Sequence, residues 1–246
     1  MTIREPEFVD LPTPRGPMRC MVFRPTGEGR HPGLVLYSEI FQITAPIRRT
    51  AAFLAGHGFI VAVPEVYHEF LPAGTVLAYD QPGADKGNEL KYSKEVASYD
   101  DDARAVVAYL KSHAAGTGRV GAIGICLGGH LSFRTAMLAD VTATVCFYAT
   151  DIHHGTLGKG KADNSLARIP DIKGELMMIW GRQDPHVPGE ARAKIYGALT
   201  AAGTTFMWHE FNGAHAFLRD EGLRYDAELS HLTMGMTVDF FRRRLA

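Results

Sequence analysis

Short apolar segments alternate with longer amphipathic ones along the chain. The short segments are rich in β-branched and aromatic residues, and several are apolar throughout, which is typical of strands buried on both faces of a parallel sheet. We predict such strands at residues 18–23, 33–37, 59–63, 120–125, 142–148, 175–180 and 204–208.

The segments between these strands carry helix signals. One begins near Pro46 and stops at Gly56, and a second, at 96–110, repeats apolar residues on one helical face. A third ends at Gly203, and a fourth, at 227–245, has three arginines in its last turn, where cations favour the negative end of a helix. This alternation predicts an α/β fold: a single domain over 1–246, with a mostly parallel sheet flanked by helices.

Two stretches are expected to be extended loops. The first, 68–88, is interrupted by prolines and glycines, and the second, 151–170, carries two adjacent histidines and the sequence GKGK. Loops this long in a compact domain are often functional. We therefore expect both to border a pocket.

Composition and charge narrow the class of protein. The 246 residues are 46% apolar and 22% charged, with a net charge of −1. Such a chain is expected to fold, and it lacks the basic excess of a nucleic-acid-binding protein. No apolar run approaches the roughly 18 residues of a membrane helix, and the acidic residues near the start do not fit a signal peptide. We expect a cytoplasmic protein that binds neither membrane nor nucleic acid.

Three cysteines are spread widely along the chain, at Cys20, Cys126 and Cys146. Their odd number and spacing fit neither a disulfide framework nor a zinc site. Cys20 and Cys146 lie inside predicted strands, so we expect both in the core.

The strongest chemical signal lies where the 120–125 strand ends. The strand runs into Gly124-Ile125-Cys126-Leu127-Gly128-Gly129, and a helix-forming stretch follows. This is the strand–turn–helix context of a nucleophile elbow, with Cys126 in place of serine. The following helix would favour a thiolate, and the backbone N–H of Leu127 would face a developing oxyanion. The alternative is a structural cysteine in a glycine-rich turn.

A nucleophile elbow predicts an acid and then a histidine later in the chain. Asp184 follows the 175–180 strand. His215 follows the 204–208 strand and lies two residues after Gly213. The carboxyl ends of strands are where open α/β sheets build their sites. We predict that His215 activates Cys126 and that Asp184 orients the imidazole.

Several neighbouring side chains offer alternatives. Asp151 also follows a strand and is a rival for the acid, His186 is expected to line the pocket, and His130 is expected on the wrong side of the elbow helix. His153 and His154 are adjacent, and adjacent histidines seldom bind one ion. No other ligand spacing completes a site, so we expect no metal.

The elbow, acid and histidine in this order resemble the dienelactone hydrolase family, the cysteine branch of the α/β-hydrolase fold. The resemblance spans about residues 22–241 and includes Ser38-Glu39-Ile40-Phe41 after the 33–37 strand. It implies that Glu39 contacts the resting Cys126 thiol and swings away as substrate binds. It also implies that the Ile40 backbone N–H is a second oxyanion donor.

The resemblance further implies a substrate and a reaction. In the family a thiolate attacks an ester or lactone carbonyl, and two arginines hold the carboxylate of a dienelactone. Arg219, four residues after His215, matches one arginine, whereas Glu69 stands near Tyr67 where the other is expected. We expect Arg219, Tyr67 and Glu69 to contact the substrate, with Glu69 repelling an anionic one.

We therefore expect a carboxymethylenebutenolidase-like, cysteine-dependent hydrolase of small carboxylic esters or lactones that needs no cofactor. Two other interpretations stay open. One is a non-catalytic ligand-binding or redox-sensing member of the fold, and the other is a hydrolase of another bond, such as a thioester or a C–C bond. No feature of the sequence indicates an oligomeric state.

Overall fold

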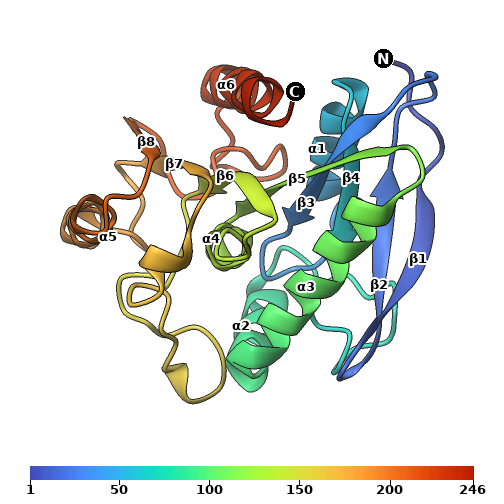
Figure 1. Cartoon of the computed structure of the whole chain (residues 1–246). Coiled ribbons are helices and arrows are strands. Elements are labelled where there is room, and N and C mark those ends of the chain that lie inside the picture. The colour runs from blue at the N-terminus through green and yellow to red at the C-terminus, as the bar shows by residue number, and fades with distance from the viewer.

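A sheet of eight strands forms the centre of the molecule in the computed structural model, which describes residues 1–246 (Figure 1). The strand order is β1-β2-β4-β3-β5-β6-β7-β8, and all neighbours from β4 to β8 are parallel. The strands are β1 (Glu7–Thr13), β2 (Gly16–Phe23), β3 (His31–Tyr37), β4 (Ile60–Pro64), β5 (Gly116–Ile125), β6 (Val141–Phe147), β7 (Glu175–Gly181) and β8 (Phe206–Phe211).

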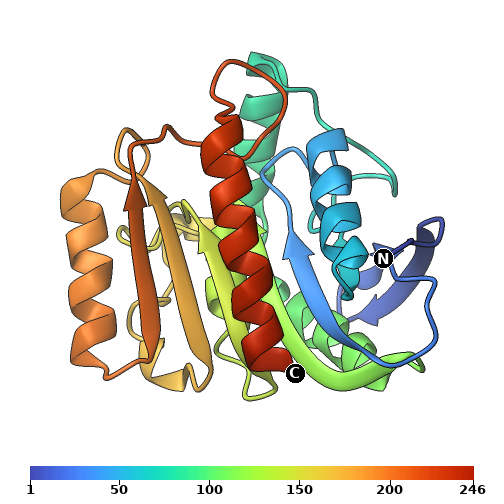
Figure 2. The same cartoon turned by 90° about the horizontal axis from the view of Figure 1, so that it is seen from above.

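Helices cover both faces of this sheet. One face carries α1 (Ala45–Gly56) and α6 (Ala227–Leu245), and α6 crosses the middle of the sheet (Figure 2). The other face carries α2 (Gln81–Ser93), α3 (Val96–Ser112), α4 (Leu127–Thr135) and α5 (Gly189–Ala201). The predicted α/β architecture, a mostly parallel sheet flanked by helices, is therefore confirmed. No helix combines the length and the apolarity that a membrane span requires.

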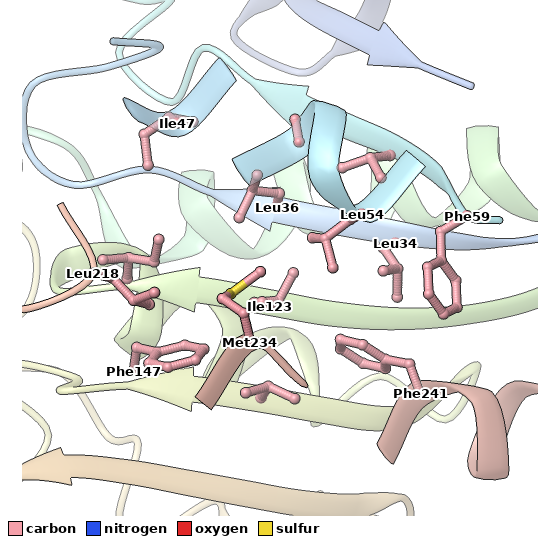
Figure 3. Close-up of a cluster of buried hydrophobic side chains, with 14 of the residues drawn as sticks. Leu34, Leu36, Ile47, Leu54, Phe59, Ile123, Phe147, Leu218, Met234 and Phe241 are labelled. Carbon is pink, nitrogen blue, oxygen red and sulfur yellow. The ribbon is translucent and has the colours of Figure 1, made fainter. Parts of the chain in front are cut away.

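Apolar side chains from the sheet and the helices form a continuous core on the α1 and α6 side. Figure 3 shows strand residues meeting helix residues there, among them Leu34, Leu36, Ile123, Phe147, Ile47, Leu54, Met234 and Phe241. Full burial of one such side chain stabilises the fold by about 1.5–3 kcal/mol. The same sheet packs on its other face against α3, α4 and α5. Cys20 and Cys146 are fully buried in that packing, as expected.

The strand order creates one crevice at the carboxyl edge of the sheet. The chain leaves β3 toward β4 on one side, and β5 lies on the other side, so the segments after β3 and β5 diverge. Ligands bind at such a switch point in open α/β sheets. The register pairs Tyr37 with Gly124, which sets residues 38–41 beside Cys126.

Two elements were not predicted. β1 is an exposed edge strand that pairs only with β2, and its polar residues and Pro12 hide the pattern. α2 replaces the second half of the expected 68–88 loop. Asp80 caps this helix by accepting from the Gly83 N–H at 2.8 Å. Gly87 is required because a Cβ there would lie 2.6 Å from the Ile40 carbonyl oxygen, so α2 packs directly on the segment after β3.

Candidate active site

Cys126 lies on the sharp turn between β5 and α4. Its φ of 61° and ψ of −117° place it in the left-handed half of conformational space, which is strained for any residue but glycine. Its N–H donates to the Phe147 carbonyl at 3.1 Å, and its carbonyl accepts from the Gly129 N–H at 3.0 Å. These bonds hold the strained conformation, and the side chain reaches the cavity above the sheet.

The glycines around Cys126 are required by close backbone contacts. A Cβ on Gly124 would lie 1.9 Å from the Gly128 carbonyl oxygen, and a Cβ on Gly128 would lie 2.2 Å from the Tyr37 carbonyl oxygen. Both distances are far inside van der Waals contact. The glycine pattern in the sequence therefore follows from how tightly α4 approaches β3 and β5.

Asp184 and His215 form a buried hydrogen-bonded pair. Nδ1 of His215 lies 2.7 Å from Oδ2 of Asp184, and the two residues are 5% and 3% exposed. Two backbone bonds tie the turns that carry them: the Arg182 N–H donates to Phe211 and the Gln183 N–H donates to Gly213. The loops after β7 and β8 are thus joined, which explains why residues 31 positions apart meet.

The charges around this pair favour an imidazolium. Burial lowers the pKa of His215, but the negative charge on Cys126 and the hydrogen bond to Asp184 outweigh it and raise the pKa to about 10. Burial raises the pKa of Asp184, and the hydrogen bond to His215 together with the His186 N–H lowers it below its usual value. Asp184 is therefore ionised, and His215 carries a proton near neutral pH.

Cys126 and His215 line one cavity of about 640 Å³ at the carboxyl edge of the sheet. Glu39 and Ile40 enter it from the segment after β3, and His186 enters it beside His215, with the two rings 4.6 Å apart. The backbone N–H groups of Ile40 and Leu127 donate to no other group of the chain. Neither amide therefore has an acceptor within the chain, and Ile40 itself lines the cavity.

Glu39 is placed differently from what the resemblance implied. Its carboxylate, 3% exposed, accepts from the Tyr79 hydroxyl at 2.9 Å and lies 3.7 Å from an Arg219 Nη1. No hydrogen bond joins this carboxylate to the Cys126 sulfur. Burial raises the pKa of Glu39, and the Arg219 charge and the Tyr79 hydroxyl oppose this rise.

The sequence profile described as the Dienelactone hydrolase family matches residues 18–245. The chain belongs to the dienelactone hydrolase family. It is 39% identical to a Saccharomyces cerevisiae protein named "Putative carboxymethylenebutenolidase", over 97% of this chain and 91% of that one. It is 26% identical to the carboxymethylenebutenolidase of Pseudomonas putida, over 85% of this chain and 84% of that one.

Solved structures agree on the fold. The crystal structure of a "Putative Dienelactone Hydrolase" from Klebsiella pneumoniae superimposes with a TM-score of 0.83 at 20% identity, covering 98% of this chain and 99% of that one. The predicted family and α/β-hydrolase fold are therefore confirmed. The chain is a dienelactone hydrolase-like hydrolase.

Besides His215, one lysine and two arginines line the cavity of this family member. Arg219 lies over the Tyr79 ring at 4.3 Å, and Arg224 is exposed at the rim without an ion pair. Lys91, from α2, pairs with Asp151 at 2.9 Å. Only Arg219 was expected, because Lys91 lies between the expected 68–88 loop and the expected 96–110 helix, and Arg224 lies in a segment without periodicity. The pairing with Lys91 also shows that Asp151 is not the partner of His215.

Two residues expected to contact substrate lie outside the cavity, and this corrects the prediction. Tyr67 is fully buried and donates its hydroxyl proton to the Gly87 carbonyl at 3.0 Å. Glu69 bonds Lys94 and Ser98 instead. Lys94 has no exposed surface, so carboxylates must lie beside it to compensate its buried charge. Glu69 therefore presents no charge to a substrate.

The expected 151–170 loop is present, with two short 3₁₀ helices, η1 (Lys159–Lys161) and η2 (Ile169–Asp171). Its first residues reach the cavity through His153 and His154, whose rings lie 3.8 Å apart. No cluster of three or more His, Cys, Asp or Glu side chains has the arrangement of a metal site.

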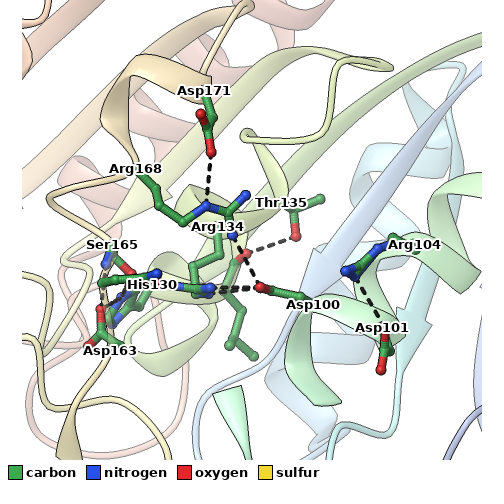
Figure 4. Close-up of polar contacts among 12 residues, drawn as sticks. Asp100, Asp101, Arg104, His130, Arg134, Thr135, Asp163, Ser165, Arg168 and Asp171 are labelled. Atoms are coloured by element: carbon green, nitrogen blue, oxygen red, sulfur yellow. Dashed lines mark hydrogen bonds and ion pairs between the residues drawn. The ribbon is translucent and has the colours of Figure 1, made fainter. Parts of the chain in front are cut away.

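A buried polar network ties this loop to α3 and α4 (Figure 4). Arg134 pairs with Asp100 at 2.7 Å and donates to Ser165 at 3.0 Å. His130 lies within 2.8 Å of the same Ser165 hydroxyl, away from the cavity, as expected. Arg168 adds a second contact to Asp100 at 3.2 Å. The network anchors the wall of the cavity to the elbow helix.

Proposed function

We propose that this chain is a cysteine-dependent hydrolase of carboxylic esters or lactones with Cys126 as the nucleophile. One observation carries the proposal: the buried pair of His215 and Asp184, 2.7 Å apart, opens on the cavity that holds the strained Cys126. A nucleophile, a base and an orienting acid in this order are what acyl transfer requires.

The reaction follows from these groups. The Cys126 thiolate attacks the carbonyl carbon, a C–S bond forms, and the oxyanion accepts hydrogen bonds from the Ile40 and Leu127 amides. When the carbonyl re-forms, the C–O bond breaks and His215 gives its proton to the leaving alkoxide. His215 then takes a proton from water as the water oxygen attacks the thioester carbonyl. The C–S bond breaks, the carboxylic acid leaves, and the Cys126 thiolate and the protonated His215 are restored.

The cavity favours a small substrate with an anionic group. Its volume of about 640 Å³ lies in the range of small-molecule sites. Arg224 has no ion-pair partner, and Arg219 shares the Glu39 charge at a distance of 3.7 Å, so both retain the capacity to bind a carboxylate. The named relatives are carboxymethylenebutenolidases, and we propose a carboxylated lactone of that kind as the substrate class.

Substitution of Cys126 tests this function. In Cys126→Ala, hydrolysis of cis-dienelactone and of a small aryl ester should fall at least about a thousandfold, because no nucleophile remains. Cys20→Ala removes a buried cysteine far from the cavity and should keep both activities. Turnover at the native rate in folded Cys126→Ala would contradict the proposal. If a thioester is included as a third substrate and only its hydrolysis is lost in Cys126→Ala, the enzyme is a thioesterase instead.

A further inference from the structure

Tyr79 contacts both the buried Glu39 carboxylate and Arg219, the other partner of that carboxylate. Its hydroxyl donates to Glu39 Oε2 at 2.9 Å, and its ring lies under the Arg219 guanidinium at 4.3 Å. The phenol has one proton, so the Thr44 hydroxyl, 2.7 Å away, donates in turn to the Tyr79 oxygen. A directed chain of hydrogen bonds therefore runs from Thr44 through Tyr79 to Glu39.

The position of Tyr79 is set by contacts with Phe41, which lies in the same segment after β3 as Glu39, and by the start of α2. Its ring packs edge-on against Phe41 at 4.7 Å. The chain before it is tied by the Leu77 N–H, which donates to the Phe41 carbonyl at 3.1 Å. The chain after it begins α2, where Asp80 is the capping residue. Tyr79 is thus a fixed donor against which the Glu39 carboxylate can be held or released.

Glu39 and Cys126 line the same cavity, and the β3–β5 register sets their segments side by side. A carboxylate that accepts the thiol proton's hydrogen bond stabilises the neutral thiol, and its charge opposes the thiolate. In this structure the Glu39 carboxylate is hydrogen-bonded to Tyr79, so it does not stabilise the neutral form of the Cys126 thiol. Removal of the Tyr79 hydroxyl would leave Cys126 as an available donor in the same cavity.

We propose that Tyr79 is a positioning residue that holds Glu39 away from Cys126 and thereby keeps the thiol easy to ionise. The proposal rests on the proposed function only in assuming that the reactive group is Cys126. It adds a residue for which the sequence carried no signal, because Tyr79 lies in a stretch expected to be an open loop.

The test is the pH profile of Cys126 alkylation by iodoacetamide in Tyr79→Phe, which keeps the ring and removes only the hydroxyl. The midpoint of the profile should rise by about one pH unit, so alkylation at pH 7 slows about tenfold. Tyr67→Phe is the matched control, because it also removes one buried phenol hydrogen bond, to α2, without touching Glu39. Its profile should match that of the native chain.

A double-substitution cycle with Glu39→Gln isolates the coupling. In the Glu39→Gln background, Tyr79→Phe should leave the alkylation profile unmoved, because no carboxylate remains to be released. An unmoved profile for Tyr79→Phe alone, an equal shift in Tyr67→Phe, or a shift that persists without Glu39 would each overturn the proposal. Failure of the proposed function would show separately, as hydrolysis retained in Cys126→Ala.

Discussion

At Cys126 the backbone and the neighbouring charges act on the same sulfur atom. The positive φ of 61° directs the side chain out of the sheet edge, and His215 stands ready as its cationic partner. Asp184, held by the His186 N–H as well as by His215, keeps the ring oriented. Because these residues act as a unit, the losses caused by their single substitutions are not expected to add.

The raised pKa of His215 predicts an alkaline limit to activity. The imidazolium that protonates the leaving alkoxide is lost as pH rises through about 10, so kcat/KM should fall there. Asp184 contributes to that raised pKa, and Asp184→Asn should therefore move the fall to lower pH, with kcat reduced about 10⁴-fold, as when a triad acid is removed. The measurement is the pH dependence of aryl ester hydrolysis.

Asp151→Asn serves as the control for this profile. Asp151 also follows a strand and lines the cavity, but its carboxylate pairs with Lys91. Its substitution should leave the alkaline fall where it is. If the alkaline fall moves in Asp151→Asn and stays in place in Asp184→Asn, Asp151 and not Asp184 is the acid that orients His215.

The elbow is the element on which the site depends. Gly128→Ala places a methyl group 2.2 Å from the Tyr37 carbonyl oxygen, and neither backbone can yield without moving β3 or α4. We expect a loss of at least about 3 kcal/mol in unfolding free energy and loss of activity. Gly197→Ala in α5 meets no atom within 4 Å and should stabilise by up to about 1 kcal/mol. Urea unfolding measures both changes. Native stability in Gly128→Ala would contradict the close contact between Gly128 and the Tyr37 carbonyl.

Most of the strands and the elbow could be predicted from the sequence. All seven predicted strands are present, because buried parallel strands are apolar throughout and leave a strong pattern. The elbow and the two residues Asp184 and His215 were predicted for a related reason: glycine and strand ends mark positions that the backbone geometry demands.

The rest of the site depends on contacts that leave no local pattern. α2 carries Gly83 and Gly87 and has a weak apolar face, so its first part was expected to belong to the 68–88 loop and its last turn was given no element. Tyr79 and Lys91 were missed for that reason. Glu69 was misplaced because its partner, the buried Lys94, lies 25 residues further along the chain, directly after α2. Such pairings between distant segments become visible only when the fold is known.

At the scale of the whole molecule, the network around Arg134 joins three parts of the chain: α3, α4 and the 151–170 loop. Arg134→Met removes a nearly buried charge and leaves Asp100 short of its main partner. Stability should fall by about 2–3 kcal/mol, and KM should rise because the loop carries His153 and His154 into the cavity. Thermal unfolding and steady-state kinetics measure the two effects.

The neighbouring pair Arg104–Asp101, drawn in Figure 4, is the matched control. It lies on the exposed side of α3, so Arg104→Met should change stability by no more than about 0.5 kcal/mol and leave KM unchanged. Equal losses in the two variants would mean that the network does not anchor the loop.

The measurement that tests the central claim most directly is the site of acylation. The enzyme would be mixed with an activated aryl ester, quenched in acid within milliseconds, digested and analysed by mass spectrometry. The account predicts that the acyl mass is found as a thioester on the peptide containing Cys126, and that the adduct and turnover are absent in Cys126→Ala. An adduct on another residue, or native turnover by Cys126→Ala, would contradict it.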